Sequence, residues 1–313
     1  MSLRKTTIFP ASAGLQLCRF RWGYLLAIAL LPGCTPSPKK SSPTSAVSSP
    51  ETVLRISVQP TQDRAEQERM IAPLDAHLEK VLGQQVDFII AKDYQDSVNM
   101  LVDRRTNALY GGVVSYFEAL ERGAKVIPLV APIDAGTVRP WYRSCLVVAA
   151  NSSIKTLKDL KGKRVAFVNP SSTSGYLMPV AALKQEGIDP DRNFAKVVFG
   201  GTHAETEALL AANRVDAIAT NLATYNQWQK ESKAENARMI WQSDPVPHAP
   251  ILVSSDIPPE LLEKLKEAFL TTPTGIKDLM GAKSAGYTLV EAEDYESIGE
   301  LRRQINLSGE SSQ

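Results

Sequence analysis

From residue 53 onward, two patterns of apolar positions alternate along the chain. Short apolar runs, typical of buried strands, are followed by stretches in which apolar residues recur every three or four positions, as on one face of a helix. The first such stretch places Ile71, Leu74, Leu78 and Val81 on one face. The runs predict strands at residues 53–58, 86–90, 108–114, 126–130, 144–149, 165–168, 197–199, 215–219 and 239–241. This alternation favours parallel sheets that are covered by helices on both faces.

We predict two such sheets. Residues 150–238 contain three strand–helix units of their own, and the chain would enter and leave this stretch through adjacent crossing strands. The expected organisation after the leader is a first lobe beginning at 52–143, a second lobe at 144–242, and a return to the first lobe with C-terminal helices at 243–313. Two α/β lobes joined by two crossings form a ligand cleft at the carboxyl ends of their strands.

The N-terminal segment differs from the rest. Residues 1–33 carry four cations, no acidic residue and an apolar run at 22–31, which is shorter than the ~20 residues that span a bilayer as a helix. This pattern predicts a signal peptide. The run ends in Leu31-Pro32-Gly33-Cys34, which resembles a bacterial lipobox and makes Cys34 the predicted lipidation site. An ordinary signal peptide, or a short anchor that is not cleaved, is the alternative.

Residues 34–51 are rich in serine, proline and lysine, and they predict a flexible tether. The expected location is therefore the periplasmic or other extracytoplasmic face of a membrane, with the protein held there by its lipid. Cleavage before Cys34 would leave 31 Lys and Arg against 34 Asp and Glu, a net charge of −3. A mildly acidic chain without a basic stripe is not expected to bind nucleic acid. Cys145 would be the one cysteine of the folded part, so we expect no disulfide framework and a core position for Cys145.

The most informative segment follows the sixth predicted strand. Ser171, Ser172, Thr173 and Ser174 are consecutive, and Gly175 and an amphipathic helical pattern come next. A helix N-terminus offers free backbone N–H groups and a partial positive charge, so it binds anions without a formal cation. Several hydroxyls beside it favour a tetrahedral oxyanion, and we expect Gly175 to let this ligand approach the backbone. A polar loop with an ordinary helix cap is the alternative.

Further short motifs occur in a regular order along the chain. They are Asp93-Tyr94, Gly111-Gly112-Val113-Val114-Ser115-Tyr116, Gly200-Gly201-Thr202-His203, Arg214-Val215-Asp216-Ala217 and Pro245-Val246-Pro247. Together with Ser-Thr-Ser-Gly they make residues 53–259 resemble the phosphonate, phosphite and phosphate binding proteins of ABC transporters. The resemblance implies an α/β, two-lobed type II periplasmic-binding-protein fold, with a mostly parallel, helix-covered sheet in each lobe and a ligand cleft between the lobes.

The resemblance also implies which residues bind the ligand: Tyr94, Tyr116, Ser172, Thr173, Ser174, His203 and Asn221. The hydroxyl residues would hold the anion from one lobe and the two tyrosines from the other, while His203 would reach in from a helix start. Either tyrosine could instead be a buried aromatic residue, and His203 could be a cap or a surface residue. Relatives that take aminophosphonates have carboxylates where this chain has Asn221 and His248, so an aminated ligand is disfavoured here.

Signals of an enzyme are weak, because the chain has no Gly-x-Ser-x-Gly and no His-Glu-x-x-His motif. We therefore expect a monomeric binding protein, not an enzyme, which needs no cofactor or metal and passes a phosphate-type oxyanion to an ABC permease with an ATPase subunit. Two alternatives remain open at this point. One is a binding protein for sulfonate, sulfate or selenate, and the other is a lipoprotein that senses a ligand and signals without transport.

Overall fold

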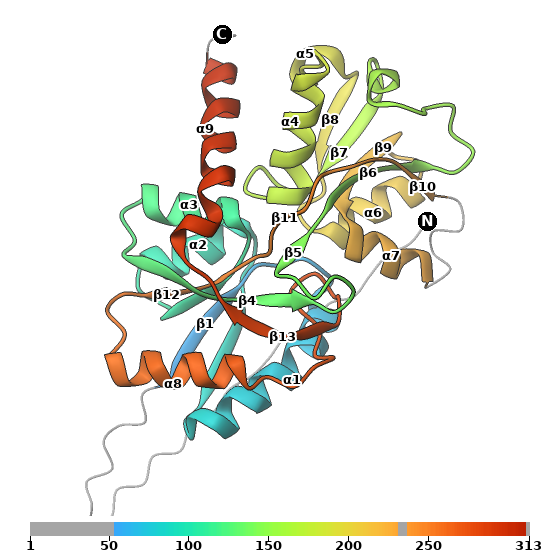
Figure 1. The fold of residues 1–313 in the computed structure, drawn as a ribbon. Helices are drawn as coiled ribbons and strands as arrows, with labels where there is room; N and C mark the ends of the chain where they lie inside the picture. The colour runs from blue at the N-terminus through green and yellow to red at the C-terminus, as the bar shows by residue number, and fades with distance from the viewer. Residues whose placement is uncertain (1–52, 231–236, 311–313) are drawn as a thin grey trace, which may run out of the picture. The chain divides into compact units, whose positions relative to one another are not determined.

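The computed structural model describes residues 53–230 and 237–310, which form two helix-covered sheets and a two-stranded crossing (Figure 1). The first sheet has the strand order β13-β4-β12-β3-β1-β2. Its strands are β1 (Leu54–Val58), β2 (Val86–Ile90), β3 (Ala108–Tyr110), β4 (Val126–Asp134), β12 (Ile251–Ser254) and β13 (Ser284–Leu289). Its helices are α1 (Arg64–Leu82), α2 (Tyr94–Val102), α3 (Val113–Glu121), α8 (Pro259–Leu270), η3 (Ala292–Tyr295) and α9 (Glu296–Glu310). We call these elements the first lobe.

Helices cover both faces of the first sheet. Along β12, Ile251 and Val253 point into one hydrophobic cluster, while Leu252 points into another. Because successive side chains of a strand point to opposite faces, the two clusters lie on opposite sides of the sheet. Helices α1 and α8 close the first cluster, and α2, α3 and α9 close the second.

The second lobe is built around a five-stranded sheet with the order β10-β6-β9-β7-β8. Its strands are β6 (Ser144–Ala149), β7 (Arg164–Phe167), β8 (Lys196–Phe199), β9 (Ala217–Asn221) and β10 (Ala237–Gln242). Its helices are η1 (Leu157–Leu160), η2 (Thr173–Leu177), α4 (Met178–Gln185), α5 (Pro190–Asn193), α6 (His203–Ala211) and α7 (Leu222–Lys230). Leu146 and Val148 face α4, whereas Cys145 and Val147 face α6 and α7, so this sheet is also covered on both sides. The expected core position of Cys145 is confirmed, since this residue is fully buried.

The chain crosses between the lobes on two short strands, β5 (Trp141–Tyr142) and β11 (Val246–Pro247). They pair antiparallel, with Val246 opposite Tyr142 and Pro247 opposite Trp141. The predicted adjacent crossings are therefore confirmed. Tyr142 is placed at the junction of the two lobes by this pairing.

Two expectations about the strands were wrong in detail, and two strands, β12 and β13, were not predicted. Both sheets are mixed, not mostly parallel, because β4, β12, β13, β6 and β10 pair antiparallel with their neighbours. The predicted strand at 108–114 stops at Tyr110, because Gly111 and Gly112 turn the chain into α3. Strand β13 was not predicted, since its sequence Ser-Ala-Gly-Tyr-Thr-Leu has little apolar alternation.

The predicted signal peptide, tether and lipidation site Cys34 lie outside the described residues. Within the described part of the chain, no helix has both the length and the apolar character needed to cross a membrane.

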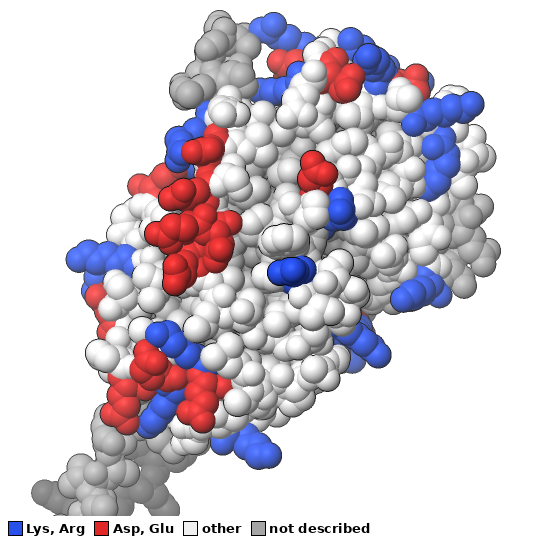
Figure 2. All heavy atoms as spheres, in the orientation of Figure 1, with Lys and Arg blue, Asp and Glu red and all other residues white. Residues whose placement is uncertain are grey.

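Exposed carboxylates gather over η3 and the start of α9, where the face in Figure 2 shows a group of acidic side chains. They are Glu291, Glu293, Asp294, Glu296 and Glu300.

Candidate functional site

Residues 171–174, which we call the hydroxyl loop, follow β7 and include the first two residues of η2, which leads into α4. Each of the four residues is at most 3% exposed. Ser172 is the N-cap of η2, and its Oγ accepts a hydrogen bond of 2.9 Å from the backbone N–H of Gly175. Ser172 therefore does what an ordinary cap does. The hydroxyls of Thr173 and Ser174 have other surroundings.

The structure gives a different reason for Gly175 from the one expected. A Cβ atom at this position would collide with the side chain of Val168 at the end of β7. The backbone of Gly175 also accepts the Val168 N–H at 3.0 Å. The glycine is thus required because the hydroxyl loop folds back tightly on its own strand.

Thr173 reaches across to the first lobe. Its Oγ1 accepts a hydrogen bond of 3.2 Å from the backbone N–H of Val114, in the first turn of α3. The N-cap of α3 is Gly112, which has no side chain to fill this role. A helix start from the first lobe and the hydroxyl loop of the second lobe therefore meet at Thr173.

Two tyrosine hydroxyls approach the hydroxyl loop. Burial raises the pKa of Tyr94, the first residue of α2, and a hydrogen bond with Ser172 partly opposes this rise. Burial raises the pKa of Tyr142 in β5 to about 12, opposed by hydrogen bonds with Ser174 and Thr173. Both phenols are therefore neutral donors at physiological pH. The sequence analysis missed Tyr142, although its place in a predicted crossing between two lobes was a usable signal.

A hydrogen bond to its carbonyl holds Ser174 in place, whereas its side-chain hydroxyl has no well-aligned hydrogen bond within the described residues. Its carbonyl accepts a hydrogen bond of 2.6 Å from Ser144 Oγ. Its own Oγ is buried and makes no hydrogen bond of good alignment within the described residues, although the Tyr142 hydroxyl is close by. A buried hydroxyl in this state is costly unless a ligand completes its bonding.

His203 begins α6 and is fully buried. Its Nδ1 lies 2.9 Å from Thr220 Oγ1, and its Nε2 lies 3.5 Å from Asn221 Nδ2. Burial lowers the pKa of His203 to about 4, so the imidazole is neutral at physiological pH. The N–H groups of His203 and Ala204 donate to the carbonyl of Thr61 in the first lobe, at 3.0 and 3.4 Å. A carbonyl of the opposite lobe therefore occupies the N-terminus of α6.

Asn221, at the end of β9, caps the following helix. Its Oδ1 accepts the Thr224 N–H at 2.9 Å, and its Nδ2 donates to Thr224 Oγ1 at 2.8 Å. Strands β7, β8 and β9 run parallel, so the helices that follow them all start at one edge of the sheet. This edge is where the structure brings together the hydroxyl loop, His203 and Asn221.

The structure does not bring Tyr116 to this place. Its ring packs against Phe117 at 5.1 Å and against Tyr295 at 6.0 Å, between ring centroids, in a hydrophobic cluster of the first lobe. Burial and the nearby carboxylate of Glu293 raise the pKa of its hydroxyl. Tyr116 is therefore a core aromatic residue, and Tyr142 is the second tyrosine whose hydroxyl approaches the hydroxyl loop.

The hydroxyl of Ser171, like that of Thr173, joins the two lobes. Its Oγ donates to Glu118 Oε1 at 2.8 Å and accepts from Gln95 Nε2 at 2.9 Å. Gln95 Nε2 lies 3.0 Å from the other oxygen of Glu118. Burial raises the pKa of Glu118, and the hydrogen bond with Ser171 is the strongest opposing effect. This group holds α2 and α3 against the hydroxyl loop.

The remaining donors have one common property. We call Tyr94, Tyr142, Ser172, Thr173, Ser174 and His203 the donor cluster. All of these residues offer hydroxyl or imidazole groups that are neutral at physiological pH, with no lysine or arginine among them. A set of neutral donors at a helix N-terminus suits an anion, because it supplies hydrogen bonds without a competing ion pair.

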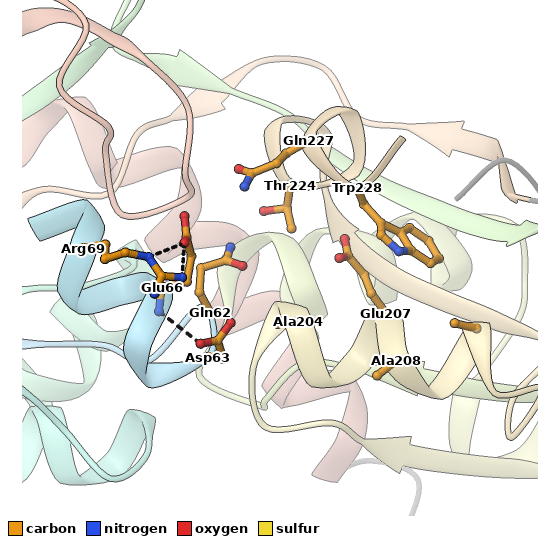
Figure 3. Close-up of a pocket in the computed structure, with 11 residues that line it drawn as sticks. Gln62, Asp63, Glu66, Arg69, Ala204, Glu207, Ala208, Thr224, Gln227 and Trp228 are labelled. Atoms are coloured by element: carbon orange, nitrogen blue, oxygen red, sulfur yellow. Dashed lines mark hydrogen bonds and ion pairs between the residues drawn. The ribbon is translucent and has the colours of Figure 1, made fainter. Parts of the chain in front are cut away.

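A pocket of about 710 Å³ lies between the start of α1 and helices α6 and α7, and it adjoins His203 and Asn221 because Ala204 and Thr224 help to line it (Figure 3). Asp63, Glu66 and Glu207 line it, together with Arg69 and Trp228. Arg69 pairs with Glu66 at 2.7 Å, so the cation in this lining is already engaged. With three carboxylates in its lining, this pocket does not suit an anion.

This chain is similar to known proteins over most of its length. The family model of the phosphonate periplasmic substrate-binding protein of ABC transporters matches residues 56–295. This chain belongs to that family. It is 30% identical to the phosphate-import protein PhnD of Mycolicibacterium smegmatis over 252 residues, which cover 77% of this chain and 78% of the relative.

Two further comparisons concern Prochlorococcus marinus. The present chain is 25% identical to a probable ABC transporter phosphite binding protein, PhnD1, of that organism. The alignment covers 90% of the present chain and 97% of PhnD1. The solved structure of PhnD1 in complex with methylphosphonate superposes with a TM-score of 0.73 and 24% identity, covering 81% of this chain and 98% of that one. The likeness confirms the predicted two-lobed type II periplasmic-binding-protein fold. As a member of this family, the chain is a substrate-binding protein of an ABC transporter.

Proposed function

We propose that the chain binds a small tetrahedral phosphorus oxyanion, namely phosphate, phosphite or a short alkylphosphonate, between its two lobes. The observation that carries this proposal is the convergence of buried neutral hydroxyls from opposite sides. Thr173 and Ser174 come from the second lobe, and Tyr94 comes from the first. The names of the relatives, which refer to phosphate, phosphite and methylphosphonate, support the same class of ligand.

The proposed ligand-binding residues are those of the donor cluster, with Asn221 beside His203 at the edge of the site. Tyr116 is left out because of its packing, and Tyr142 is added. Ser174 Oγ is buried without a well-aligned hydrogen bond from the described residues, so a ligand would complete its bonding.

We infer that the ligand is enclosed by closure of the two lobes about the β5–β11 crossing. The lobes would be residues 52–143 with 243–313, and residues 144–242. Closure about a ligand gives the permease and its ATPase partner a distinct form to recognise. We assign the chain no catalytic step and no cofactor, and we expect it to act as a monomer.

The same proposal includes a lipid anchor at Cys34. It rests on the short apolar run that ends in Leu31-Pro32-Gly33-Cys34 and on the serine- and proline-rich tether after it. A lipid at the start of such a tether would keep the two lobes close to the membrane that holds the permease.

Titration calorimetry of the purified protein tests the ligand class. The set is phosphate, phosphite, methylphosphonate, 2-aminoethylphosphonate and sulfate. We expect at least one of the first three to bind at least tenfold more tightly than sulfate, a difference of about 1.4 kcal/mol. Tighter binding of sulfate than of every phosphorus oxyanion would contradict the proposal and favour a binding protein for sulfur oxyanions.

A further inference from the structure

A buried carboxylate lies close to the crossing strands, where the sequence analysis expected no negative charge. Asp278 belongs to the first-lobe loop between α8 and β13 and is 2% exposed. Its Oδ1 accepts the backbone N–H groups of Met280 at 2.8 Å and Ala282 at 3.0 Å. Its Oδ2 lies 3.0 Å from His248 Nε2 but receives no well-aligned hydrogen bond from the described residues. His248 therefore covers this oxygen by direct contact.

His248 connects this carboxylate to the donor cluster. Its backbone N–H donates to the Pro140 carbonyl at 2.8 Å, which fixes it beside the crossing. Its ring centroid lies 5.1 Å from that of Tyr142, whose hydroxyl approaches Thr173 and Ser174. The other ring nitrogen, Nδ1, is buried and has no hydrogen-bond partner within the described part of the chain. The imidazole thus has one nitrogen against Asp278 and one without a hydrogen-bond partner among the described residues.

The same loop reaches the other candidate position. Met280 follows Asp278 by two residues, and its Sδ lies 3.4 Å from Asn221 Nδ2. The Met280 carbonyl accepts a hydrogen bond of 3.3 Å from Thr224 Oγ1. Residues 278–282 therefore contact both His248 and the surroundings of Asn221, and they form one wall beside the donor cluster.

We propose that His248 is a specificity-determining residue that covers the Asp278 carboxylate and so excludes ligands with an ammonium group. The inference rests on the proposed function. An ammonium group taken out of water needs an opposite charge beside it. Asp278 is a carboxylate in a suitable place, but one oxygen is held by two backbone N–H groups and the other is covered by His248. A carboxylate is therefore present, but both of its oxygens are engaged. The ammonium group of an aminated phosphonate would have no free negative charge beside it.

The test compares methylphosphonate with 2-aminoethylphosphonate by titration calorimetry on the full chain. His248→Asn removes the imidazole and leaves Asp278 uncovered, and we expect it to raise the affinity for the aminated ligand relative to methylphosphonate at least tenfold. The double variant His248→Asn/Asp278→Asn removes the carboxylate as well and should lose this gain. His77→Asn, in a histidine of α1 whose ring contacts the Ala268 carbonyl, is the matched control and should leave the ratio unchanged.

The outcomes separate this inference from the proposed function. If the wild-type protein binds none of the phosphorus oxyanions, the proposed function fails. If it binds them and His248→Asn leaves the ratio unchanged, only the role of His248 is overturned. A gain that persists in the double variant also overturns it, because the carboxylate is then not responsible. Should the variants fail to fold in thermal melts, the wild-type protein still decides, since tighter binding of 2-aminoethylphosphonate than of methylphosphonate contradicts a covered carboxylate.

Discussion

The backbone N–H of Val114 in the first lobe donates a hydrogen bond of 3.2 Å to Thr173 Oγ1 in the second lobe. Because α3 has no side-chain cap of its own, the opposite lobe supplies one. Thr173 therefore has two possible roles, as an interlobe cap and as a ligand donor. The first predictions separate these roles.

Thr173→Val keeps the shape of the side chain and removes its hydroxyl. We expect the affinity for the preferred phosphorus oxyanion to fall about tenfold to hundredfold, because a hydrogen bond to a charged group contributes about 1.5–3 kcal/mol. Ser174→Ala should have a similar effect. Calorimetry, with melting temperatures measured with and without ligand, checks this. Thr137→Val, at an exposed position of the first lobe, is the control. Unchanged affinity in both variants would sink the site as drawn here.

The two tyrosines Tyr142 and Tyr116 provide a matched pair. Tyr142→Phe removes a buried hydroxyl that approaches the hydroxyl loop, so ligand affinity should fall about tenfold or more. Tyr116→Phe removes a hydroxyl of a core aromatic residue and should leave affinity within about twofold. Binding isotherms for the two variants decide between the sequence-based assignment and the one from the structure. The reverse order of effects would restore Tyr116 to the site.

The buried neutral state of His203 predicts a pH dependence of stability. Its pKa is lowered to about 4 in the folded chain, whereas an unfolded histidine titrates near 6.5. Between these values the unfolded state binds a proton that the folded state does not, so the free energy of unfolding falls as the pH drops from about 6.5 towards 4. The full loss from this residue is about 3 kcal/mol. Urea unfolding at pH 7.5 and pH 5 should show it in the wild-type protein and less in His203→Gln. An equal pH dependence in both would assign the effect to other groups.

Cys34→Ala tests the anchor. The variant should appear in the soluble extracytoplasmic fraction and still bind ligand, because the lobes do not depend on the lipid. Cys145→Ala is the matched control, since this cysteine is buried in β6 and should have no effect on membrane association. If the Cys34→Ala protein stays with the membrane, the apolar run at residues 22–31 is itself the anchor.

Local chemistry was sufficient to find the hydroxyl loop and His203, because consecutive hydroxyls and a helix start are visible in the sequence. Tyr142 was missed because its strand has two residues and no periodicity, and because its role depends on pairing with Val246, far along the chain. The alternation of strands and helices likewise predicted the two lobes but not the antiparallel strands that return between them. Asp278 was not predicted at all, since its contact with His248 joins two loops that are distant in sequence.

Helix α9 has a consequence for how far the lobes can separate. It packs against α3 of the first lobe, yet Ile305 also contacts the hydrophobic cluster around α4, and the Ile305 carbonyl accepts a hydrogen bond of 3.3 Å from Lys184 (Figure 1). The lobes are thus attached at β5–β11 and, away from that crossing, through α9. Any opening wide enough to release a ligand must either break the α9–α4 contact or carry α9 away from α3. We therefore expect α9, which contributes no residue to the donor cluster, to affect the rate of ligand release.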